Sequence, residues 1–404
     1  MSERLDKLRK AAKLINETYA KVGEKPVFFM GSELDPPPRI PSGSITLDWA
    51  WGGGVIAGMP NLLWGPESIG KTSLSLRIIA YNQARDPEFV ALWLDGSGSL
   101  NGMLNYARTL GVDLDRIFPV EVSTLEEAVE VFRQVANEGL IDMLVVDDLA
   151  VYSTIKEQYK GAFKLGRSTE HAMTDQAMAT QAAANNTFIR RTKHLIKTQN
   201  IALLYTQQVR DSFESYGDEF VLGGGRGFKH ALRLNTLMQR GAKIHHPTRG
   251  SLTGDNPEFV GYALKLKIMK MAIDGAQPTG TEVLTQWTSL KGIERGRDAF
   301  MFLNQTLGLI ETHGSSRLFM DGLCEKLGVD KKTGFSTRAR TEAWLEEHYD
   351  LVYQAFVPNL ALQPKPGPKV TKEKVSKAVK KAKNLLHDPK LQQAEETEEK
   401  EIEA

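Results

Sequence analysis

The stretch from Gly65 to Thr72 reads Gly-Pro-Glu-Ser-Ile-Gly-Lys-Thr and fits the phosphate-loop pattern G-x-x-x-x-G-K-[ST] at every fixed position. Gly65 and Gly70 let the backbone curl so that its N–H groups face the phosphates of a nucleotide. Lys71 would reach the outer phosphates, and the Thr72 hydroxyl would ligate Mg²⁺. These types at this spacing predict a nucleoside triphosphate site. Its expected residues are Gly65, Pro66, Glu67, Ser68, Ile69, Gly70, Lys71, Thr72 and Ser73.

An acidic residue follows an apolar run downstream of this loop. The run Met143-Leu-Val-Val reads as a buried strand and leads into Asp147, with Asp148 beside it. A carboxylate at such a strand end can hold a Mg²⁺-bound water opposite the phosphate loop. Apolar strands also end in Asp at ordinary turns, and here the upstream phosphate loop favours the metal role. We therefore predict that Thr72 and Asp147 serve the metal.

Two further stretches, residues 155–169 and 211–229, combine cations with aromatic side chains. A single-stranded nucleic acid offers phosphates that pair with cations and bases that stack on aromatic rings. A solvated surface loop is the alternative for both stretches; glycines in the second favour a ligand, because they let the backbone approach it closely. The predicted nucleic-acid contacts in these stretches are Lys156, Lys160, Lys164, Arg167, Phe213, Tyr216, Phe220, Gly224, Gly225, Arg226 and Lys229.

The elements that must position these residues alternate along the chain. From Ile40 onward, apolar strand-like runs alternate with helical patterns, which predicts the α/β class: a mostly parallel sheet with helices on both faces. A helix should follow the loop from Thr72 to about Ala84, and Ser123 is a plausible N-cap for a later one. The predicted strands are Leu62–Trp64, Phe89–Leu94, Ile117–Val122, Met143–Val146, Ile201–Tyr205, a run from Ala231, Phe259–Met271 and Glu282–Thr288.

The two ends of the chain differ from this alternating core. Residues 2–22 predict an amphipathic helix and Pro26–Met30 a short strand, before a proline-rich linker at 36–38. Helix and strand could dock on a second subunit or on the chain's own core, and periodicity does not decide between them. We expect segments at 1–35, 36–296, 297–360 and 361–404. The third shows helical signals at Phe300–Leu307 and Thr341–Tyr353, and the last reads as partly helical and then disordered.

Composition excludes several classes of protein. A chain of 404 residues with net charge +1 can bury a large core, and its charge identifies no partner, although 364–384 are lysine-rich and 395–403 mostly glutamate. The single cysteine, Cys324, excludes an internal disulfide and fits a reducing cytosol; its simplest role is as a small buried apolar residue. No stretch approaches the ~20 apolar residues of a membrane helix, so we expect a cytoplasmic protein without membrane partners.

Taken together, these residues resemble the RecA family of recombinases, including its bacteriophage UvsX-type members. The likeness spans about residues 1–310. Its motifs are Ile40-Pro-Ser-Gly-Ser-Ile-Thr-Leu-Asp48, the glycines at 52–54, the phosphate loop, Tyr106-Ala-Arg-Thr-Leu-Gly-Val-Asp113, Val145-Val-Asp147, Gln207-Gln208-Val-Arg210 and Gly224-Gly-Arg-Gly-Phe-Lys229. The resemblance implies a RecA-type core, an N-terminal helix and strand that join subunits, and a small C-terminal α/β domain.

The resemblance also implies roles for particular residues. Tyr106 would stack on the adenine of ATP, although a core aromatic is the alternative, and Gln208 would sense the terminal phosphate. The segment from Arg210 onward, like the earlier stretch rich in cations and aromatics, falls where the family's DNA-binding loops lie. The implied assembly is a helical filament of identical subunits that uses ATP and Mg²⁺, binds single-stranded and duplex DNA, and works with single-strand-binding and loader proteins in a bacterial cell or a phage-infected host.

Two departures from the family pattern concern catalysis. The family's water-activating glutamate is missing, because no glutamate lies between Asp95 and Tyr106, and Asp95 is the nearest acid. Loss of general-base assistance typically costs ~10²- to 10⁴-fold in rate. Of the family's two cations that reach the neighbour's nucleotide, Lys270 matches the first and Ala272 replaces the second. Lys265 and Lys267 could substitute, or could simply line an exposed strand face.

Three functions follow from these patterns. The first is a DNA-dependent ATPase that pairs and exchanges strands in recombination and repair, with Lys71, Asp95, Gln208 and Lys270 as its catalytic residues. The second is a RecA-like filament that binds ATP and DNA as a scaffold with little hydrolysis. The third, a helicase or clock-type ATPase with the same core, fits the N-terminal segment and residues 224–229 less well.

Overall fold

The computed structural model describes residues 3–21, 27–96, 98–122, 124–148, 172–211, 220–245, 259–288, 291–330 and 333–357. Two compact units result, Met1–Pro38 and Arg39–Ala404, and each is considered by itself. Several predictions lie outside the described residues: those for Lys156, Lys160, Lys164, Arg167, Phe213, Tyr216 and the tail from 361 to 404. In the described part of the chain, no helix combines the length and the apolar character needed to cross a bilayer.

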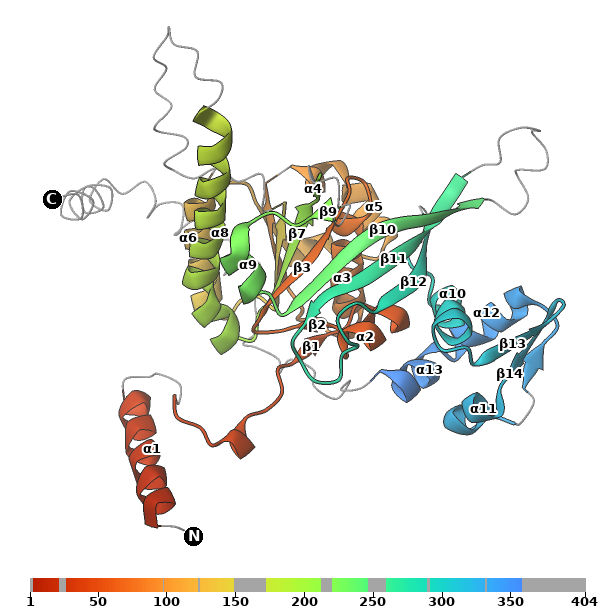
Figure 1. Ribbon diagram of the computed structural model, residues 1–404, viewed down its shortest axis with the longest axis horizontal. Coiled ribbons are helices and arrows are strands. Elements are labelled where there is room, and N and C mark those ends of the chain that lie inside the picture. The colour runs from red at the N-terminus through yellow and green to blue at the C-terminus, as the bar shows by residue number, and fades with distance from the viewer. Residues whose placement is uncertain are drawn as a thin grey trace, which may run out of the picture. The chain divides into compact units, whose positions relative to one another are not determined.

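The second unit is built on one large sheet (Figure 1). Its strands are β3 (Pro60–Gly65), β4 (Ala91–Asp95), β5 (Ile117–Val120), β6 (Met143–Asp147), β7 (Ala202–Gln208), β10 (Leu234–His245), β11 (Phe259–Met271) and β12 (Glu282–Thr288). The order across the sheet is β12-β11-β10-β3-β7-β6-β4-β5. The six strands from β10 to β5 are parallel, and β11 and β12 are antiparallel. The predicted α/β class is confirmed.

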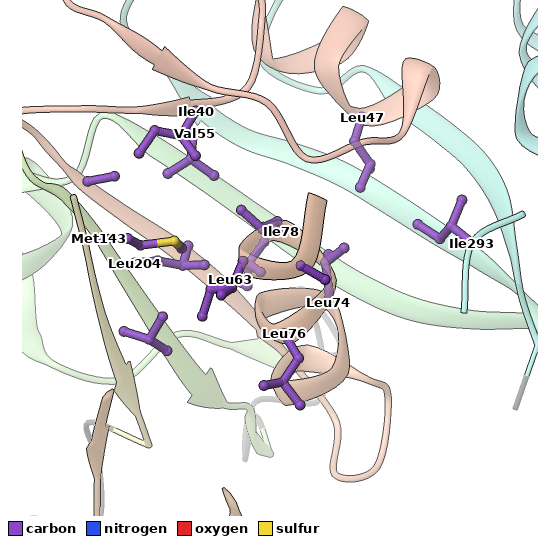
Figure 2. Close-up of a cluster of buried hydrophobic side chains, with 14 of the residues drawn as sticks. Ile40, Leu47, Val55, Leu63, Leu74, Leu76, Ile78, Met143, Leu204 and Ile293 are labelled. Carbon is purple, nitrogen blue, oxygen red and sulfur yellow. The ribbon is translucent and has the colours of Figure 1, made fainter. Parts of the chain in front are cut away.

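Helices cover both faces of this sheet, because side chains in a strand alternate between faces and both alternate sets are apolar here. In β6, Met143 and Val145 belong to the cluster around α3, whereas Leu144 and Val146 belong to the cluster under α6 and α8. Figure 2 shows the first cluster, where Leu74 and Ile78 of α3 lie beside Leu63. The helices are α2 (Ile45–Trp51), α3 (Lys71–Arg85), α4 (Ser99–Gly102), α5 (Leu104–Thr109), α6 (Leu125–Asn137), α8 (Ala172–Thr198) and α9 (Gly225–Ala231).

The predicted strands and helices agree with this core except in detail. Each of the eight runs predicted as strands between residues 62 and 288 coincides with or overlaps a strand. The prediction of Ser123 as an N-cap is wrong, because α6 is capped by Thr124. The Thr124 side chain accepts from the Glu127 N–H, and the Glu127 carboxylate accepts from the Thr124 N–H, which forms a complete capping box. Short elements complete the core: β1 (Arg39–Ile40), β2 (Val55–Ile56), η2 (Leu114–Arg116), β8 (Arg210–Asp211) and β9 (Phe220–Val221).

A C-terminal region, residues 291–357, packs on the core through its own hydrophobic cluster, which includes Ile45 of α2. The helical signal predicted from Thr341 to Tyr353 divides at His348 into two helices, and Cys324 is buried, as predicted. The elements are α10 (Arg295–Met301), the π-helical turn η3 (Phe302–Thr306), β13 (Ile310–His313), β14 (Ser316–Phe319), α11 (Asp321–Leu327), β15 (Gly334–Phe335), α12 (Arg338–Glu347) and α13 (Tyr349–Phe356).

Buried polar bonds join the C-terminal region to the motif from Ile40 to Asp48. Asp298 accepts hydrogen bonds from the hydroxyls of Ser44 (2.7 Å) and Thr46 (2.6 Å). The Asp48 carboxylate accepts from the Ser42 N–H (2.8 Å) and from the Tyr353 hydroxyl (2.5 Å). Both carboxyls are buried, so each needs these donors to offset its lost hydration. The motif from Ile40 to Asp48 thus anchors the C-terminal region.

The first unit contains α1 (Glu3–Lys21) and the short turn η1 (Gly31–Glu33). The strand predicted at Pro26–Met30 is wrong for the described residues 27–30, which pair with no strand. Instead, the Asn16 side chain of α1 accepts from the N–H groups of Val27 and Phe28 and donates to the Phe28 carbonyl. No residue of α1 is buried. The unit therefore leaves the apolar side of its helix exposed.

Candidate nucleotide and nucleic-acid sites

The phosphate loop lies at the carboxyl edge of the sheet, between β3 and the start of α3. Gly65 is required because a Cβ there would collide with the Met238 carbonyl of β10. Gly70 precedes the helix with φ +97°, a left-handed conformation that favours glycine. Ser68 adopts φ +54°, which is uncommon for a residue with a side chain. The strand, loop and helix predicted around this pattern are all present.

Lys71 points back into its own loop. Its Nζ donates to the carbonyls of Gly65 (2.9 Å) and Pro66 (2.8 Å). Burial lowers the pKa of Lys71, and the nearby carboxylates of Asp148 and Asp147 oppose that change. A cation held at the loop in this way is suited to bind the oxygens of a phosphate.

Asp147 gathers three hydroxyl groups around its carboxylate. It accepts hydrogen bonds from Thr72 (2.8 Å), Ser99 (3.0 Å) and Thr206 (2.5 Å). The four residues come from α3, α4, β7 and the end of β6, so neighbouring parallel strands bring them to the same edge. Mg²⁺ prefers oxygen ligands and keeps several waters. The two protein groups predicted to serve this ion, the Thr72 hydroxyl and the Asp147 carboxylate, thus lie together and are hydrogen-bonded to each other.

Asp95 lies at the same edge, one strand from Asp147, because the two residues are partners in the β4–β6 register. Both carboxylate oxygens accept from backbone N–H groups that follow: Ser99 to Oδ1 and Leu100 to Oδ2, each at 3.0 Å. Burial raises the pKa of Asp95, and these N–H groups oppose the rise. Asp95 therefore caps the turn into α4, a structural role that competes with its predicted role as a base.

Gln208 ends β7 on the other side of Asp147. Its N–H donates to the Asp148 carboxylate (3.2 Å), and the next N–H, of Val209, donates to the Gly65 carbonyl (3.3 Å). The Gln208 side chain is exposed. In the sequence, the predicted phosphate sensor Gln208 directly precedes the segment predicted to bind nucleic acid.

Tyr106 of α5 is half-buried and packs against the cluster around α3. Burial raises the pKa of Tyr106, and neighbouring Trp287 and Ser73 oppose the rise. The Tyr106 hydroxyl therefore lies near Ser73, the last residue of the predicted phosphate site. The packing fits the core-aromatic role, and the contact with adenine stays a prediction.

The cations considered for the neighbour's nucleotide are engaged within the chain. Lys270 Nζ donates to the carbonyls of Lys229 (3.0 Å) and His230 (2.9 Å) at the end of α9, and burial lowers the pKa of Lys270. Lys265 and Lys267 both pair with Glu282 on β12, at 2.8 and 3.7 Å. These exposed pairs hold weakly and could be exchanged.

The described part of the candidate nucleic-acid interface is α9 with β8 and β9. Arg226 and Lys229 are exposed, and Gly224 (φ +94°) and Gly225 (φ +77°) begin the helix. Phe220 is half-buried and packs partly against the core, and its predicted stacking on bases stays a prediction. Arg210 pairs with Val221 through its backbone, and its side chain lies outside the described atoms.

The glycines of this segment serve packing as well as access. A Cβ on Gly227 would lie 2.5 Å from Asn186 Oδ1 of α8, and one on Gly224 would lie 2.9 Å from the Phe228 ring. Phe228 is buried against Tyr205, with ring centroids 5.5 Å apart. The glycine pattern that suggested a ligand therefore also lets α9 lie close to α8 while Arg226 faces solvent.

Two residues at the phosphate loop were missed from the sequence. Arg240 of β10 donates to the Ser68 carbonyl (2.5 Å), and Tyr262 of β11 donates to the Ile69 carbonyl (2.8 Å). No motif marks either residue. The one signal was length: the predicted strand Phe259–Met271 is much longer than the predicted strand Leu62–Trp64 before the phosphate loop. A strand of that length in the same sheet must extend past the end of β3, where the loop begins.

Comparison with known proteins gives one consistent result. A family model described as the RecA N-terminal domain matches residues 7–281. Protein RecA of Thermus aquaticus is 32% identical over 235 residues, 57% of this chain and 62% of that protein. Protein RecA of Aquifex pyrophilus is 28% identical over 272 residues (67% and 71%), and that of Thermotoga neapolitana 28% over 312 residues (76% and 80%). The matches thus span between 62% and 80% of these relatives.

Proposed function

The chain belongs to the RecA family, and from that premise we propose that it is an ATP-dependent recombination protein. In this proposal it forms a helical filament on single-stranded DNA, pairs that strand with a homologous duplex and exchanges strands. Single-strand-binding and loader proteins, a UvsX-like role and a cytoplasmic setting in a bacterial or phage-infected cell belong to the same proposal.

The observation that carries the proposal is the hydrogen bond from Thr72 to Asp147 (2.8 Å) beside the Lys71 ammonium. This is the donor set that a magnesium-bound nucleoside triphosphate requires: a cation for the outer phosphates, a hydroxyl for the metal and a carboxylate behind it. When bound, ATP with Mg²⁺ would supply the phosphoanhydride whose cleavage resets the protein. The chain's own residues hold the phosphates, orient the metal's hydroxyl ligand and shield the site on the sheet side.

Two surfaces support a filament on DNA. The exposed cations Arg226 and Lys229 on α9 can pair with phosphates, and this helix follows Gln208 along the chain. In the first unit, α1 exposes Leu8 (52%) and Leu14 (66%), and Phe29 in the following segment is 50% exposed. Apolar groups exposed on a helix and an adjoining extended segment suit docking on a second copy of this chain.

The scaffold alternative rests on specific observations as well. Asp95 commits both oxygens to backbone donors, Ala272 stands in place of a cation, and Lys270 is held by α9 carbonyls. A filament that binds ATP and DNA but turns ATP over slowly would fit this arrangement. Ala272→Lys would restore the second cation and should raise the rate of hydrolysis if turnover is limited there.

Steady-state ATP hydrolysis with and without single-stranded DNA separates the two functions. The natural protein is compared with Lys71→Ala, Asp95→Ala and Asp95→Asn; the last keeps one acceptor oxygen for the α4 turn. DNA-stimulated hydrolysis lost in all three variants would support the recombinase ATPase with Asp95 as base. Hydrolysis lost in Lys71→Ala and retained in Asp95→Asn would assign Asp95 its capping role. Negligible hydrolysis beside nucleotide-dependent DNA binding would leave the scaffold.

A further inference from the structure

Side chains of the antiparallel strands β10 and β11 form hydrogen bonds with the phosphate loop. Strand β10 has 12 residues and β3 has 6, and their pairing runs only from Leu234 to Leu237 on β10. The rest of β10, with β11 beside it, extends past the end of β3 and along the loop (Figure 1). Arg240 and Tyr262 lie on this extension, and the Arg240 guanidinium stacks 4.8 Å from the centroid of the Tyr262 ring.

Each of these side chains fixes one peptide unit of the loop. Arg240 Nη2 donates to the Ser68 carbonyl, and the Tyr262 hydroxyl donates to the Ile69 carbonyl. Neither peptide bond is cis, and in a planar trans peptide the N–H points opposite to the C=O. The N–H groups of Ile69 and Gly70 are therefore turned away from β10 and β11. Within the described part of the chain, neither N–H donates to another protein group.

The loop needs such support because of its own conformation. Ser68, whose carbonyl Arg240 binds, has φ +54°, and a side-chain-bearing residue keeps this conformation only where surrounding groups hold it. The Tyr262 hydroxyl also lies 3.1 Å from the place of a Cβ on Gly70, so it closes one side of the loop. Tyr262 is buried and Arg240 is exposed, which makes Tyr262 the fixed partner and Arg240 the one that solvent can reach.

We propose that Arg240 and Tyr262 are positioning residues of the nucleotide site, which hold two successive N–H groups of the phosphate loop in the orientation that binds the β-phosphate. This assignment rests on the proposed function, since it presumes that the loop binds ATP. It adds a contribution from β10 and β11 that the phosphate-loop pattern does not contain. Neither side chain needs to touch the nucleotide; they act through the loop backbone.

The test compares nucleotides that differ in their phosphates. Tyr262→Phe removes only the hydroxyl, and Arg240→Met removes the charge and keeps the length of the side chain. Both variants should bind ADP and ATP about tenfold more weakly, as expected for loss of a hydrogen bond that orients a phosphate donor. Both should bind AMP, which lacks the β-phosphate, as the natural protein does. Affinities are measured by competition with a fluorescent ADP analogue, and thermal unfolding of each variant is recorded alongside.

Lys243→Met is the matched control, because it removes one positive charge from the same strand at the register partner of Tyr262. Within the described part of the chain, the Lys243 side chain makes no hydrogen bond or ion pair with the loop. It should bind ADP like the natural protein. Unchanged ADP affinity in Tyr262→Phe and Arg240→Met would overturn the assignment and leave the proposed function intact. Equal losses for AMP and ADP together with a lowered unfolding temperature would overturn it in favour of a structural role. Failure of the natural protein to bind ADP or ATP would overturn the proposed function and the assignment together.

Discussion

Replacing Asp48 with Asn should change how the stability of the protein depends on pH. Asp48 is fully buried, and burial raises the pKa of its carboxyl from 3.8 to about 7, although the Tyr353 hydroxyl and the Ser42 N–H favour the charged form. The folded protein therefore holds a proton on Asp48 at pH values where the unfolded chain has lost it. Protonation of Asp48 therefore contributes to the free energy of unfolding. This contribution is fully present below pH 3.8, the pKa in the unfolded chain, and is lost as pH rises to about 7, the pKa in the folded protein.

The magnitude follows from the two pKa values. Each pH unit over which the folded state holds the extra proton changes the free energy of unfolding by ~1.4 kcal/mol. Over the whole window the natural protein loses about 4 kcal/mol, of which about 3 kcal/mol falls between pH 5 and pH 8. Asp48→Asn removes this titration. Its stability relative to the natural protein should therefore rise by about 3 kcal/mol over the same range and stay level at higher pH.

The assay is urea unfolding followed by tryptophan fluorescence at half-unit steps from pH 5 to 8.5, since Trp51 is buried in the same helix. Asp142→Asn is the matched control: burial raises the pKa of Asp142 to about 6, so the difference between that variant and the natural protein should level off about one pH unit lower. Parallel loss of stability in Asp48→Asn and the natural protein between pH 5 and 8 would refute the reasoning.

Two further predictions concern the candidate sites. Gly227→Ala should weaken binding of single-stranded DNA, measured by fluorescence anisotropy, because the new Cβ would lie 2.5 Å from Asn186 Oδ1 and displace α9. Adding Asn186→Ala removes this clash and should restore binding. Binding that stays weak in the double variant would contradict the packing argument. Thr206→Val removes a 2.5 Å hydrogen bond to Asp147 and should raise the Mg²⁺ concentration for half-maximal ATP binding about tenfold, whereas Thr192→Val in α8 should leave it unchanged.

The sequence predicted those parts of the site whose functional residues lie close together along the chain. The phosphate loop combines glycines, a lysine and a hydroxyl within eight positions, and Asp147 ends an apolar run, so both could be located without a structure. The α/β class followed in the same way, because buried parallel strands are continuous apolar runs. The choice between Ser123 and Thr124 as N-cap could not be made in this way, because each has a glutamate three residues on, Glu126 and Glu127, and both fit the capping-box pattern.

Residues whose role depends on where strands end could not be predicted. Arg240 reaches Ser68 only because β10 extends past the end of β3, and sequence fixes strand ends poorly. Asp95 matched no motif beyond its position, and its engagement with two backbone donors depends on the turn that follows. The strand predicted at Pro26–Met30 failed because a strand requires a partner, which local sequence does not specify.

The bond between Asp48 and Tyr353 also constrains the order of events during synthesis. The two residues are 305 positions apart, so Asp48 leaves the ribosome long before its partner exists. At roughly 5–20 residues per second this interval is about 15–60 s. Ile45 belongs to the hydrophobic cluster of the C-terminal region, so it is synthesised a similar time before the residues on which it packs. The segment from Ile40 to Asp48 therefore reaches its final packing only after the end of the C-terminal region has emerged, and a nascent chain stopped before that point would expose it to chaperones and proteases.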